Sequence, residues 1–431
     1  MNKNYHQLFI KQEPRNPWLF EKEKKMRILI IGTYLPRQCG IATFTHDLYQ
    51  SLIKNKQQVD ILAIQNGTEG HFPKEVVHTI EQQNKQAYSD AAKWINKQQY
   101  DACILQHEFG IFAGDAGNYI LDLAKEIQVP LITNLHTVLE KPNAHEYTVV
   151  RELAKYSRKI TVMTQRAINM LSEVYEIATE QLHLIPHGIP EFKISAQEAK
   201  EYLGLEDKTV MLSFGLLGRG KGFEVAIDAV SKIKSDNFVY IILGATHPNV
   251  LLQEGESYKN GLMQQAANLG LNGKVIFVNK YASDSLLHTY LKACDLYVTP
   301  YPNANQMSSG TLTFALGAGA AVLSTPYWYA KDLLADGRGC LFDFNNPDSL
   351  ADCINNLLEN PKSLMEYRRK ALKFGKSMSW INVGKKQIKL IQSITTAKSV
   401  KKSVVKELNS LKNIIQPINI KLLGQKSAIN H

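Results

Sequence analysis

Short apolar segments alternate with amphipathic helical segments along most of this 431-residue chain, and the alternation starts twice. The apolar segments are not interrupted by polar residues, so strands formed by them would be buried on both faces. Buried strands joined by helices are typical of a parallel sheet that is covered on both sides. The sequence therefore predicts an α/β fold with two doubly wound, Rossmann-like domains.

The two series of predicted strands are separated by a polar segment at residues 190–208. The first series is MRILIIG, VDILAI, ACILQH, PLITNLH, KITVMT and LHLIPHG, and the second is TVMLSFG, FVYIILGA, KVIFVN, DLYVTPY, AAVLST and GCLFDF. We predict an appendage at 1–25, a first domain at 26–190, a second domain at 191–376, a crossover helix at 377–395 and a basic tail at 396–431.

Composition limits the compartment and the class of protein. Hydrophobic residues make up 44% of the chain, yet no apolar run reaches the ~18 residues that a membrane span needs. The first 25 residues lack the continuous apolar core of a secretory signal. The five cysteines are scattered and form no CxxC pair, which argues against a zinc site or a disulfide framework. We therefore expect a cytoplasmic protein that holds no metal.

The positive charge of the chain is concentrated at its end. The net charge is +10, and residues 384–431 hold ten lysines against one acid, Glu407. The folded domains are thus near neutral, which argues against nucleic acid as a partner. Five apolar residues of the tail fall at helical spacing, namely Val400, Val404, Leu408, Leu411 and Ile415. Such a helix either packs on the first domain, as most amphipathic stripes do, or lies on an anionic membrane surface.

The carboxyl ends of the strands of the first domain carry the polar residues that ligand binding requires. Gly40 follows the first strand and precedes a helix, so it belongs either to a turn that approaches phosphate or to an ordinary tight turn. His107 and Glu108 end the third predicted strand, His136 ends the next, and His187 ends the last. Each histidine alone is compatible with a buried structural role, but three at strand ends favour a polar cleft.

The second domain shows two candidate anion sites. The first is the glycine-rich loop SFGLLGRGKG, which holds Arg219 and Lys221. Its glycines let the backbone approach a ligand, and the two cations suit a diphosphate. The second is the sequence QMSSGT, where Ser308, Ser309 and Thr311 are residue types that cap a helix. A helix start with small residues presents free backbone N–H groups to an anion.

These motifs together resemble the GT-B retaining glycosyltransferases of family four, over about residues 26–394. The segments that carry the resemblance are CGIATFT, QHEFGIF, NLHT, IPHGIP, GLLGRGKGFE and SSGTLTFALGAGAAV. The resemblance implies two domains that face a cleft, with the nucleotide-sugar donor on the second domain and the acceptor on the first. It also implies a bacterial branch of glycosyltransferase-like proteins.

The resemblance assigns roles to individual residues. It implies catalytic roles for His136, Arg219, Lys221 and Gln306. Donor contacts are implied for Gly40, Gly215, Gly218, Ser308, Ser309, Gly310 and Thr311, and acceptor-side positions for His107, Glu108 and His187.

The chain departs from the family pattern at several of these positions. Leu216 stands where the family has its phosphate-binding arginine, so Arg219 would have to reach the phosphates from a shifted place. Gln306 and Phe314 replace two glutamates, of which the first contacts the transferred sugar and the second the ribose. His187 replaces the usual asparagine. These changes preserve diphosphate binding in principle and put ribose recognition in doubt.

The resemblance thus implies transfer of a hexose from a nucleotide sugar to a hydroxyl group of a sugar or lipid-linked acceptor, with retention and with no cofactor. The principal alternative is a weak or inactive relative that binds a sugar nucleotide or a partner. A phosphorylase would need a lysine for pyridoxal phosphate in a distinctive context, and an epimerase of this fold is a further alternative. A dinucleotide-dependent dehydrogenase would need GxGxxG followed by an acid about 20 residues on, and neither pattern is convincing here.

Overall fold

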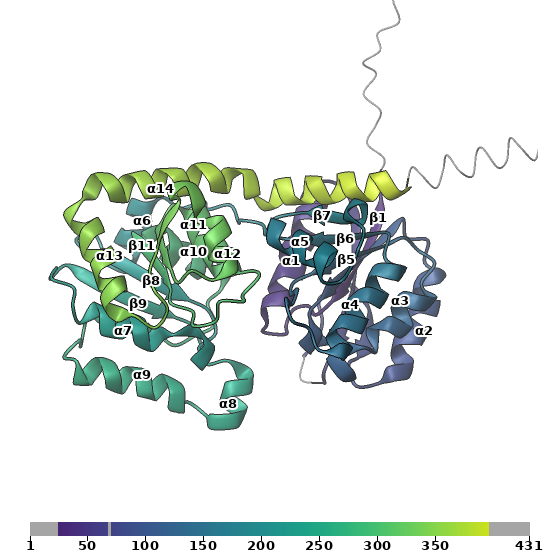
Figure 1. The fold of residues 1–431 in the computed structure, drawn as a ribbon, viewed down its shortest axis with the longest axis horizontal. Coiled ribbons are helices and arrows are strands. Elements are labelled where there is room, and N and C mark those ends of the chain that lie inside the picture. Colours follow the sequence, from purple (N-terminus) through teal and green to yellow (C-terminus); the bar gives the residue numbers. More distant parts are fainter. Residues whose placement is uncertain (1–24, 68–69, 396–431) are drawn as a thin grey trace, which may run out of the picture.

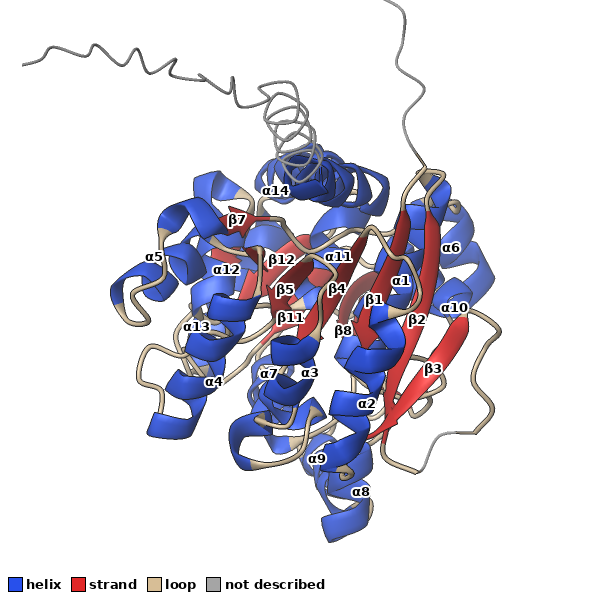
Figure 2. Ribbon diagram, turned by 90° about the vertical axis from the view of Figure 1, so that its right-hand side faces the viewer, coloured by secondary structure: helices blue, strands red, loops and turns tan. Residues whose placement is uncertain are grey.

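The computed structural model describes residues 25–67 and 70–395, which form two α/β domains side by side (Figure 1). One sheet has the strand order β3-β2-β1-β4-β5-β6-β7 and the other the order β10-β9-β8-β11-β12-β13. Every pairing within the two sheets is parallel. Helices cover both faces of the sheets (Figure 2). The predicted α/β fold class is confirmed.

The first domain contains seven strands in the part of the chain that the structure describes. They are β1 (Arg27–Gly32), β2 (Gln58–Gln65), β3 (Val76–Glu81), β4 (Ala102–His107), β5 (Leu131–Leu135), β6 (Lys159–Val162) and β7 (Leu182–Leu184). The helices are α1 (Gly40–Lys54), α2 (Lys85–Asn96), α3 (Ile120–Glu126), α4 (Ala144–Tyr156) and α5 (Gln165–Glu173). Sequence analysis missed β3, an edge strand of mainly half-buried residues with no continuous apolar run.

The second domain repeats this architecture. Its strands are β8 (Thr209–Phe214), β9 (Phe238–Leu243), β10 (Val275–Val278), β11 (Leu296–Thr299), β12 (Ala321–Ser324) and β13 (Gly339–Leu341). Its helices are α6 (Ala196–Leu203), α7 (Phe223–Val230), α8 (Pro248–Glu254), α9 (Ser257–Asn268), α10 (Asp284–Ala293), α11 (Gly310–Ala318), α12 (Trp328–Leu333), α13 (Pro347–Glu359) and α14 (Pro361–Gly375).

A helix at residues 380–395 follows α14 and returns to the first domain, so that the last described segment runs along both domains (Figure 1). The Ser51 hydroxyl on α1 donates a hydrogen bond to the Trp380 carbonyl oxygen, and the Asn55 amide donates to the Ile381 carbonyl oxygen at 3.1 Å. The appendage and the basic tail predicted at the two ends lie, apart from Lys25, outside the described residues.

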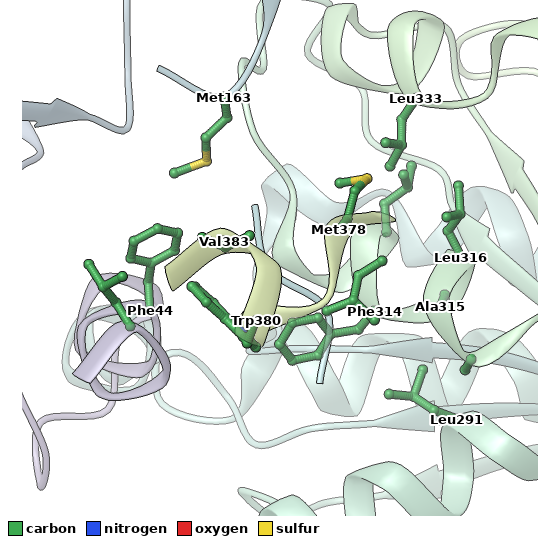
Figure 3. Close-up of a cluster of buried hydrophobic side chains, with 14 of the residues drawn as sticks. Phe44, Met163, Leu291, Phe314, Ala315, Leu316, Leu333, Met378, Trp380 and Val383 are labelled. Atoms are coloured by element: carbon green, nitrogen blue, oxygen red, sulfur yellow. The ribbon is translucent and has the colours of Figure 1, made fainter. Parts of the chain in front are cut away.

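Trp380 joins the two domains through a shared hydrophobic cluster (Figure 3). Its ring lies 5.1 Å from the Phe44 ring of the first domain and 5.6 Å from the His187 ring, measured between centroids. A Cβ on Gly188 would lie 2.0 Å from the indole, so only glycine fits there. Loss of a buried tryptophan of this kind costs about 3–5 kcal/mol.

Candidate functional site

The position of a ligand site follows from the order of the strands. In each sheet the order in which successive strands are added reverses between two neighbouring strands, β1 and β4 in the first domain and β8 and β11 in the second. Ligands of open α/β sheets bind beyond the carboxyl ends of such strand pairs. Gly40 begins the helix after β1, and Glu108 directly follows β4. Lys221 and Tyr301 lie in the segments after β8 and β11. The predicted motifs therefore lie at both switch points.

In the second domain, Lys221 and the start of α11 are linked through Tyr301. The Lys221 ammonium lies 4.3 Å from the centroid of the Tyr301 ring, which is a cation–π distance. The Tyr301 hydroxyl hydrogen-bonds the Thr311 hydroxyl at 3.0 Å, and Thr311 in turn contacts the Ser309 hydroxyl at 3.1 Å. Ser309 caps α11, because its Oγ accepts a hydrogen bond from the Leu312 N–H at 3.3 Å.

The first turn of α11 is a suitable place for an anion. It contains no acidic residue, and the helix N-terminus carries a partial positive charge. One cation, one capped helix start and several hydroxyl groups thus meet in one place. Such an arrangement suits an anion, and it brings together the two candidate anion sites that the sequence predicts separately.

Glycines allow the loops of the second domain to approach each other this closely. Gly222 has φ 66°, and a Cβ there would lie 2.1 Å from the Pro300 carbonyl oxygen. Gly215 has φ 133°, and its Cβ would contact the Thr311 side chain at 3.5 Å. A side chain at Gly222 would push the Lys221 loop away from the loop that carries Tyr301. Gly218 is less constrained, with the nearest atom to its Cβ, on Val250, at 3.6 Å.

Arg219 does not join Lys221 in the conformation described. Its guanidinium forms an ion pair with Glu254 at 2.7 Å, and 70% of its side chain is exposed. It also lies over the Tyr258 ring, 5.4 Å from the centroid. The catalytic role predicted for Arg219 therefore requires a change of side-chain conformation and stays a prediction.

The segment before α11 contacts the first domain. The Gln306 side-chain amide donates a hydrogen bond to the Ser308 carbonyl oxygen at 2.9 Å. The Ser308 hydroxyl donates to the His136 carbonyl oxygen at 3.4 Å, across the boundary between the domains. Gln306 and His136, both predicted to contact the donor sugar, are thus linked through Ser308.

His136 and His187 are buried together around the Phe44 ring. The His136 Nε2 lies 2.8 Å from the Gln106 side-chain oxygen, and the His187 Nδ1 lies 2.8 Å from the Gly188 carbonyl oxygen. The Phe44 ring packs edge-on against both imidazoles, at centroid distances of 4.7 and 5.2 Å. Burial lowers the pKa of His136 to about 3 and that of His187 to about 4, so both imidazoles are neutral at pH 7.

His187 faces the first residue of α11 and not only the first domain. A Cβ on Gly310 would lie 3.0 Å from its Nε2 atom. Since a carbonyl oxygen can only accept, the Nδ1 atom donates to Gly188, and Nε2 is the unprotonated nitrogen of the neutral ring. His187, predicted on the acceptor side, therefore lies at the boundary between the two domains.

His107 and Glu108 are neighbours in sequence but differ in their surroundings. The His107 ring packs against Phe109 and Phe112, and within the described part of the chain neither of its nitrogens has a hydrogen-bond partner. Burial lowers its pKa to about 3. The Glu108 carboxylate accepts a hydrogen bond from the Thr137 hydroxyl at 2.7 Å, and burial raises its pKa. His107 is therefore packed like a core residue, while Glu108 is held in a polar contact.

Gly40 is the first residue of α1 and lies beside the capping residue Cys39, whose sulfur accepts from the Ala42 N–H. A Cβ on Gly40 would meet no protein atom within 4 Å, so packing within the described chain does not require glycine there. Residues 25–67 and 70–395 contain no group of three or more His, Cys, Asp or Glu side chains that could hold a metal ion. Within the same ranges, no helix has the length and apolar character needed to cross a membrane.

Sequence analysis missed two residues of this site, Tyr301 and Phe44. Tyr301 ends the predicted strand segment DLYVTPY, so its position just after a strand of the second domain was a usable signal. Phe44 lies on the buried side of α1 and resembles an ordinary core residue in the sequence.

The chain is similar in sequence and in structure to known glycosyltransferases. Residues 195–374 match the family of glycosyl transferases group 1. The mannosylfructose-phosphate synthase of Agrobacterium fabrum is 22% identical over 344 residues, which cover 72% of this chain and 73% of that protein. The N-acetylgalactosamine-N,N'-diacetylbacillosaminyl-diphospho-undecaprenol 4-alpha-N-acetylgalactosaminyltransferase of Campylobacter jejuni is 24% identical over 223 residues, or 51% of this chain and 56% of that protein.

Among solved structures, HepE of Anabaena in complex with UDP and glucose superimposes with a TM-score of 0.68 at 17% sequence identity. The match covers 85% of this chain and 100% of HepE. At this level of identity the likeness establishes the fold, and the GT-B arrangement predicted from the sequence is confirmed. The second domain carries the match to the group 1 family.

Proposed function

We propose, from the premise that this chain is a glycosyltransferase with a group 1 domain in its second half, that it transfers a hexose from a nucleotide sugar to a hydroxyl acceptor with retention. The observation that carries the proposal is the meeting of Lys221 with the N-terminus of α11 through Tyr301. A diphosphate is the group that such a site suits best, because a cation and backbone N–H donors together match its charge and its acceptor oxygens.

The reaction requires stabilisation of charge at two places. The bond between the sugar C1 and the diphosphate oxygen breaks, so the sugar becomes oxocarbenium-like while the leaving group gains negative charge. Lys221 and the start of α11 would stabilise the leaving group. Loss of one preorganised donor of this kind costs on the order of 3 kcal/mol. Neither a metal nor an organic cofactor is needed for this step in the proposal.

The acceptor hydroxyl would attack C1 from the face that the diphosphate leaves. The new bond joins C1 to the acceptor oxygen, and the acceptor proton passes to an oxygen of the departing phosphate. A protein carboxylate is then not required as a base, which suits Gln306 in place of the family's glutamate. In this proposal Gln306 and His136 orient the donor sugar, and Glu108 lines the acceptor side. His107, which the sequence also places there, is fully buried among aromatic rings and so would not contact the acceptor.

Two relatives indicate which substrates to test first. UDP and glucose are named as bound to HepE, so UDP-glucose is the first donor to examine. The name of the Campylobacter enzyme describes a diphospho-undecaprenol substrate, which supports a trial of lipid-linked acceptors. We propose a sugar or lipid-linked hydroxyl as the acceptor.

The basic tail would place a lipid-linked acceptor within reach if it bound to anionic membranes. It lies outside the described residues, so this contact rests on the sequence alone. Flotation with anionic liposomes at low salt tests it. Weaker flotation of a variant ending at Thr396 is the expected result, and equally poor flotation of both proteins would remove the membrane contact from the proposal.

The alternative is a catalytically weak or inactive relative that binds a sugar nucleotide or a partner. Phe314 favours it, because its ring packs 5.7 Å from His187 and 6.3 Å from Phe214 and offers no oxygen to a ribose. Incubation with a panel of nucleotide sugars and simple sugar acceptors, in EDTA, separates the two. Release of a nucleoside diphosphate with an α-linked product from an α-linked donor supports transfer with retention, and binding without release supports the alternative.

A further inference from the structure

We infer that Tyr301 is a positioning residue for a diphosphate site. Its ring holds the Lys221 ammonium, and its hydroxyl is bonded to Thr311 in the first turn of α11. This inference rests on the proposed function and adds to it a residue that the motifs do not assign. The inference explains how the Lys221 ammonium can be held in place by an aromatic ring instead of by an acidic side chain.

The Tyr301 ring itself is held firmly. Tyr301 is only 3% exposed, and its ring stacks on the Tyr327 ring at 5.4 Å with 19° between the planes. The Thr325 hydroxyl donates to the Tyr301 carbonyl oxygen at 2.6 Å. Tyr327 is fully buried beneath it, and its hydroxyl bonds the Thr299 hydroxyl at 3.4 Å. The ring is therefore a rigid platform with one face against Tyr327.

Tyr301 contacts both parts of the anion site, the Lys221 side chain and the first turn of α11. Its ring carries the Lys221 ammonium at 4.3 Å, and its hydroxyl bonds Thr311 in the first turn of α11. A lysine side chain has considerable rotamer freedom, so a free ammonium would have to be ordered when the ligand binds. The ring orders the ammonium beforehand, and the hydroxyl ties that position to the helix.

The chemistry of the partner distinguishes Lys221 from Arg219 in the same loop. Arg219 forms an ion pair with the Glu254 carboxylate. This carboxylate compensates the positive charge of Arg219 and would compete with a phosphate for it. Lys221 rests on a neutral ring, which attracts the ammonium through its quadrupole and leaves the full charge available to an anion. A positioned but uncompensated cation beside a helix N-terminus is what a diphosphate needs.

Two substitutions separate the ring from the hydroxyl. Tyr301→Phe keeps the platform and loses only the contact with Thr311, whereas Tyr301→Leu removes the platform. We expect UDP or GDP, titrated calorimetrically, to bind the Leu variant at least about threefold more weakly than the parent, as loss of a partly exposed cation–π contact implies. The Phe variant should retain most of the affinity.

The position of the ammonium is measured directly by NMR after reductive ¹³C-methylation of the lysines. The Lys221 methyl resonance, assigned with Lys221→Arg, should show an upfield ring-current shift in the parent and in Tyr301→Phe, and lose it in Tyr301→Leu. Tyr240→Leu serves as the matched control, because Tyr240 is buried in the same domain and its hydroxyl bonds Ser213. It should cost stability without moving the Lys221 resonance or weakening nucleotide binding.

The outcomes separate this inference from the proposed function. Loss of both the resonance shift and the affinity in the Leu variant, with recovery in the Phe variant, supports the role of Tyr301. Nucleotide binding that is equal in all variants overturns the positioning role while the proposed function stands. Failure of the parent to bind UDP, GDP or any nucleotide sugar overturns both, even if the resonance shift is present.

Discussion

The two sides of the cleft differ in the kind of polar group that they offer. The first domain contributes His107, His136 and His187, which are buried, neutral and surrounded by aromatic rings. The second contributes a lysine and the start of a helix, which carry positive charge. In the proposed function, the second domain would therefore stabilise charge and the first would shape the site.

The cause of the difference is burial. An imidazole in apolar surroundings loses the hydration that its charged form needs, and its pKa falls. Lys221 instead lies in a loop after a strand and is only half-buried. Two kinds of substitution test this difference. One removes the charge of Lys221 from the second domain, and the other replaces a buried histidine of the first domain.

The largest effect is expected for Lys221→Ala. Loss of the cation from the leaving-group site should lower kcat about 100- to 1000-fold, as removal of an oxyanion-hole donor does. The fold should be intact, since Lys221 lies in a loop. Steady-state kinetics with a productive donor measures the change, and Lys234→Ala is the control because the Lys234 side chain is 82% exposed on the same domain. A Lys221→Ala enzyme that keeps more than about a tenth of the parent kcat would disprove the assignment.

The histidines of the first domain should make folding stability depend on pH. The pKa of His107 is lowered to about 3, whereas an unfolded histidine titrates near 6.5. The unfolded chain therefore takes up protons first as the pH falls, and stability is lost between about pH 6.5 and pH 3. Each such histidine costs about 2 kcal/mol at pH 5, at 1.36 kcal/mol per pH unit.

Replacing His107 separates its contribution to the pH dependence of stability from those of the other titratable groups. Asp47 acts in the opposite direction, because burial raises its pKa to about 7, and its contribution is lost as the pH rises through that value. We therefore compare urea unfolding at pH 7 and pH 5 for the parent and His107→Met, and expect the loss on acidification to be about 2 kcal/mol smaller in the variant. His145→Met is the control, since His145 is 65% exposed. Equal losses in all three proteins would mean that His107 is not buried neutral.

Gln306 lies between the two sides, and its variants should show effects of intermediate size. Gln306→Ala should lower kcat/KM about tenfold, or ~1.4 kcal/mol, because the Ser308 contact and the contact with the sugar are both lost. Gln306→Glu should keep more activity than Gln306→Ala, because an oxygen remains for the sugar. Gln197→Ala, on the exposed surface of α6, is the control. Equal activity of the Ala and Glu variants would leave Gln306 with only its structural contact to Ser308.

The strands that build the fold were readable in the sequence because they are buried on both faces. Uninterrupted apolar runs such as RILIIG and FVYIIL favour strands in a sheet that is covered on both faces. These two runs form β1 and β9. Strand β3 has no such run, since its residues are mostly half-buried at the edge of the sheet, and it was missed. The cap of α11 was also readable, because Ser309 is the residue type that a helix start selects.

The partners of the site's side chains could not be predicted from the sequence in the same way. Arg219 and Lys221 are two residues apart in one glycine-rich loop, and the sequence alone does not show which partner each side chain contacts. The structure separates them because Glu254, on another helix, pairs with one and Tyr301, on another loop, with the other. His107 was likewise grouped with His136, although neighbouring aromatic side chains bury it without a polar partner. Such contacts depend on residues far apart in the chain.

The smallest effect concerns a contact that holds the two sides together. The Arg166 guanidinium of the first domain lies 4.2 Å from the centroid of the Trp328 ring of the second, and its Nη2 is 3.4 Å from Glu140. A cation–π contact contributes about 0.5–2 kcal/mol, so Arg166→Ala should shift an equilibrium between closed and open domains severalfold toward the open form.

Small-angle scattering tests this shift, and UDP should reduce the radius of gyration because both domains contribute to the site. We expect ligand-free Arg166→Ala to have a larger radius of gyration than the parent, and saturating UDP to bring the two closer together. Lys155→Ala is the matched control, because the Lys155 ammonium lies 5.4 Å from the Tyr156 ring within the first domain alone. If the radius is the same for all three proteins with and without UDP, the cleft is fixed, and the neutral and cationic sides do not move relative to each other.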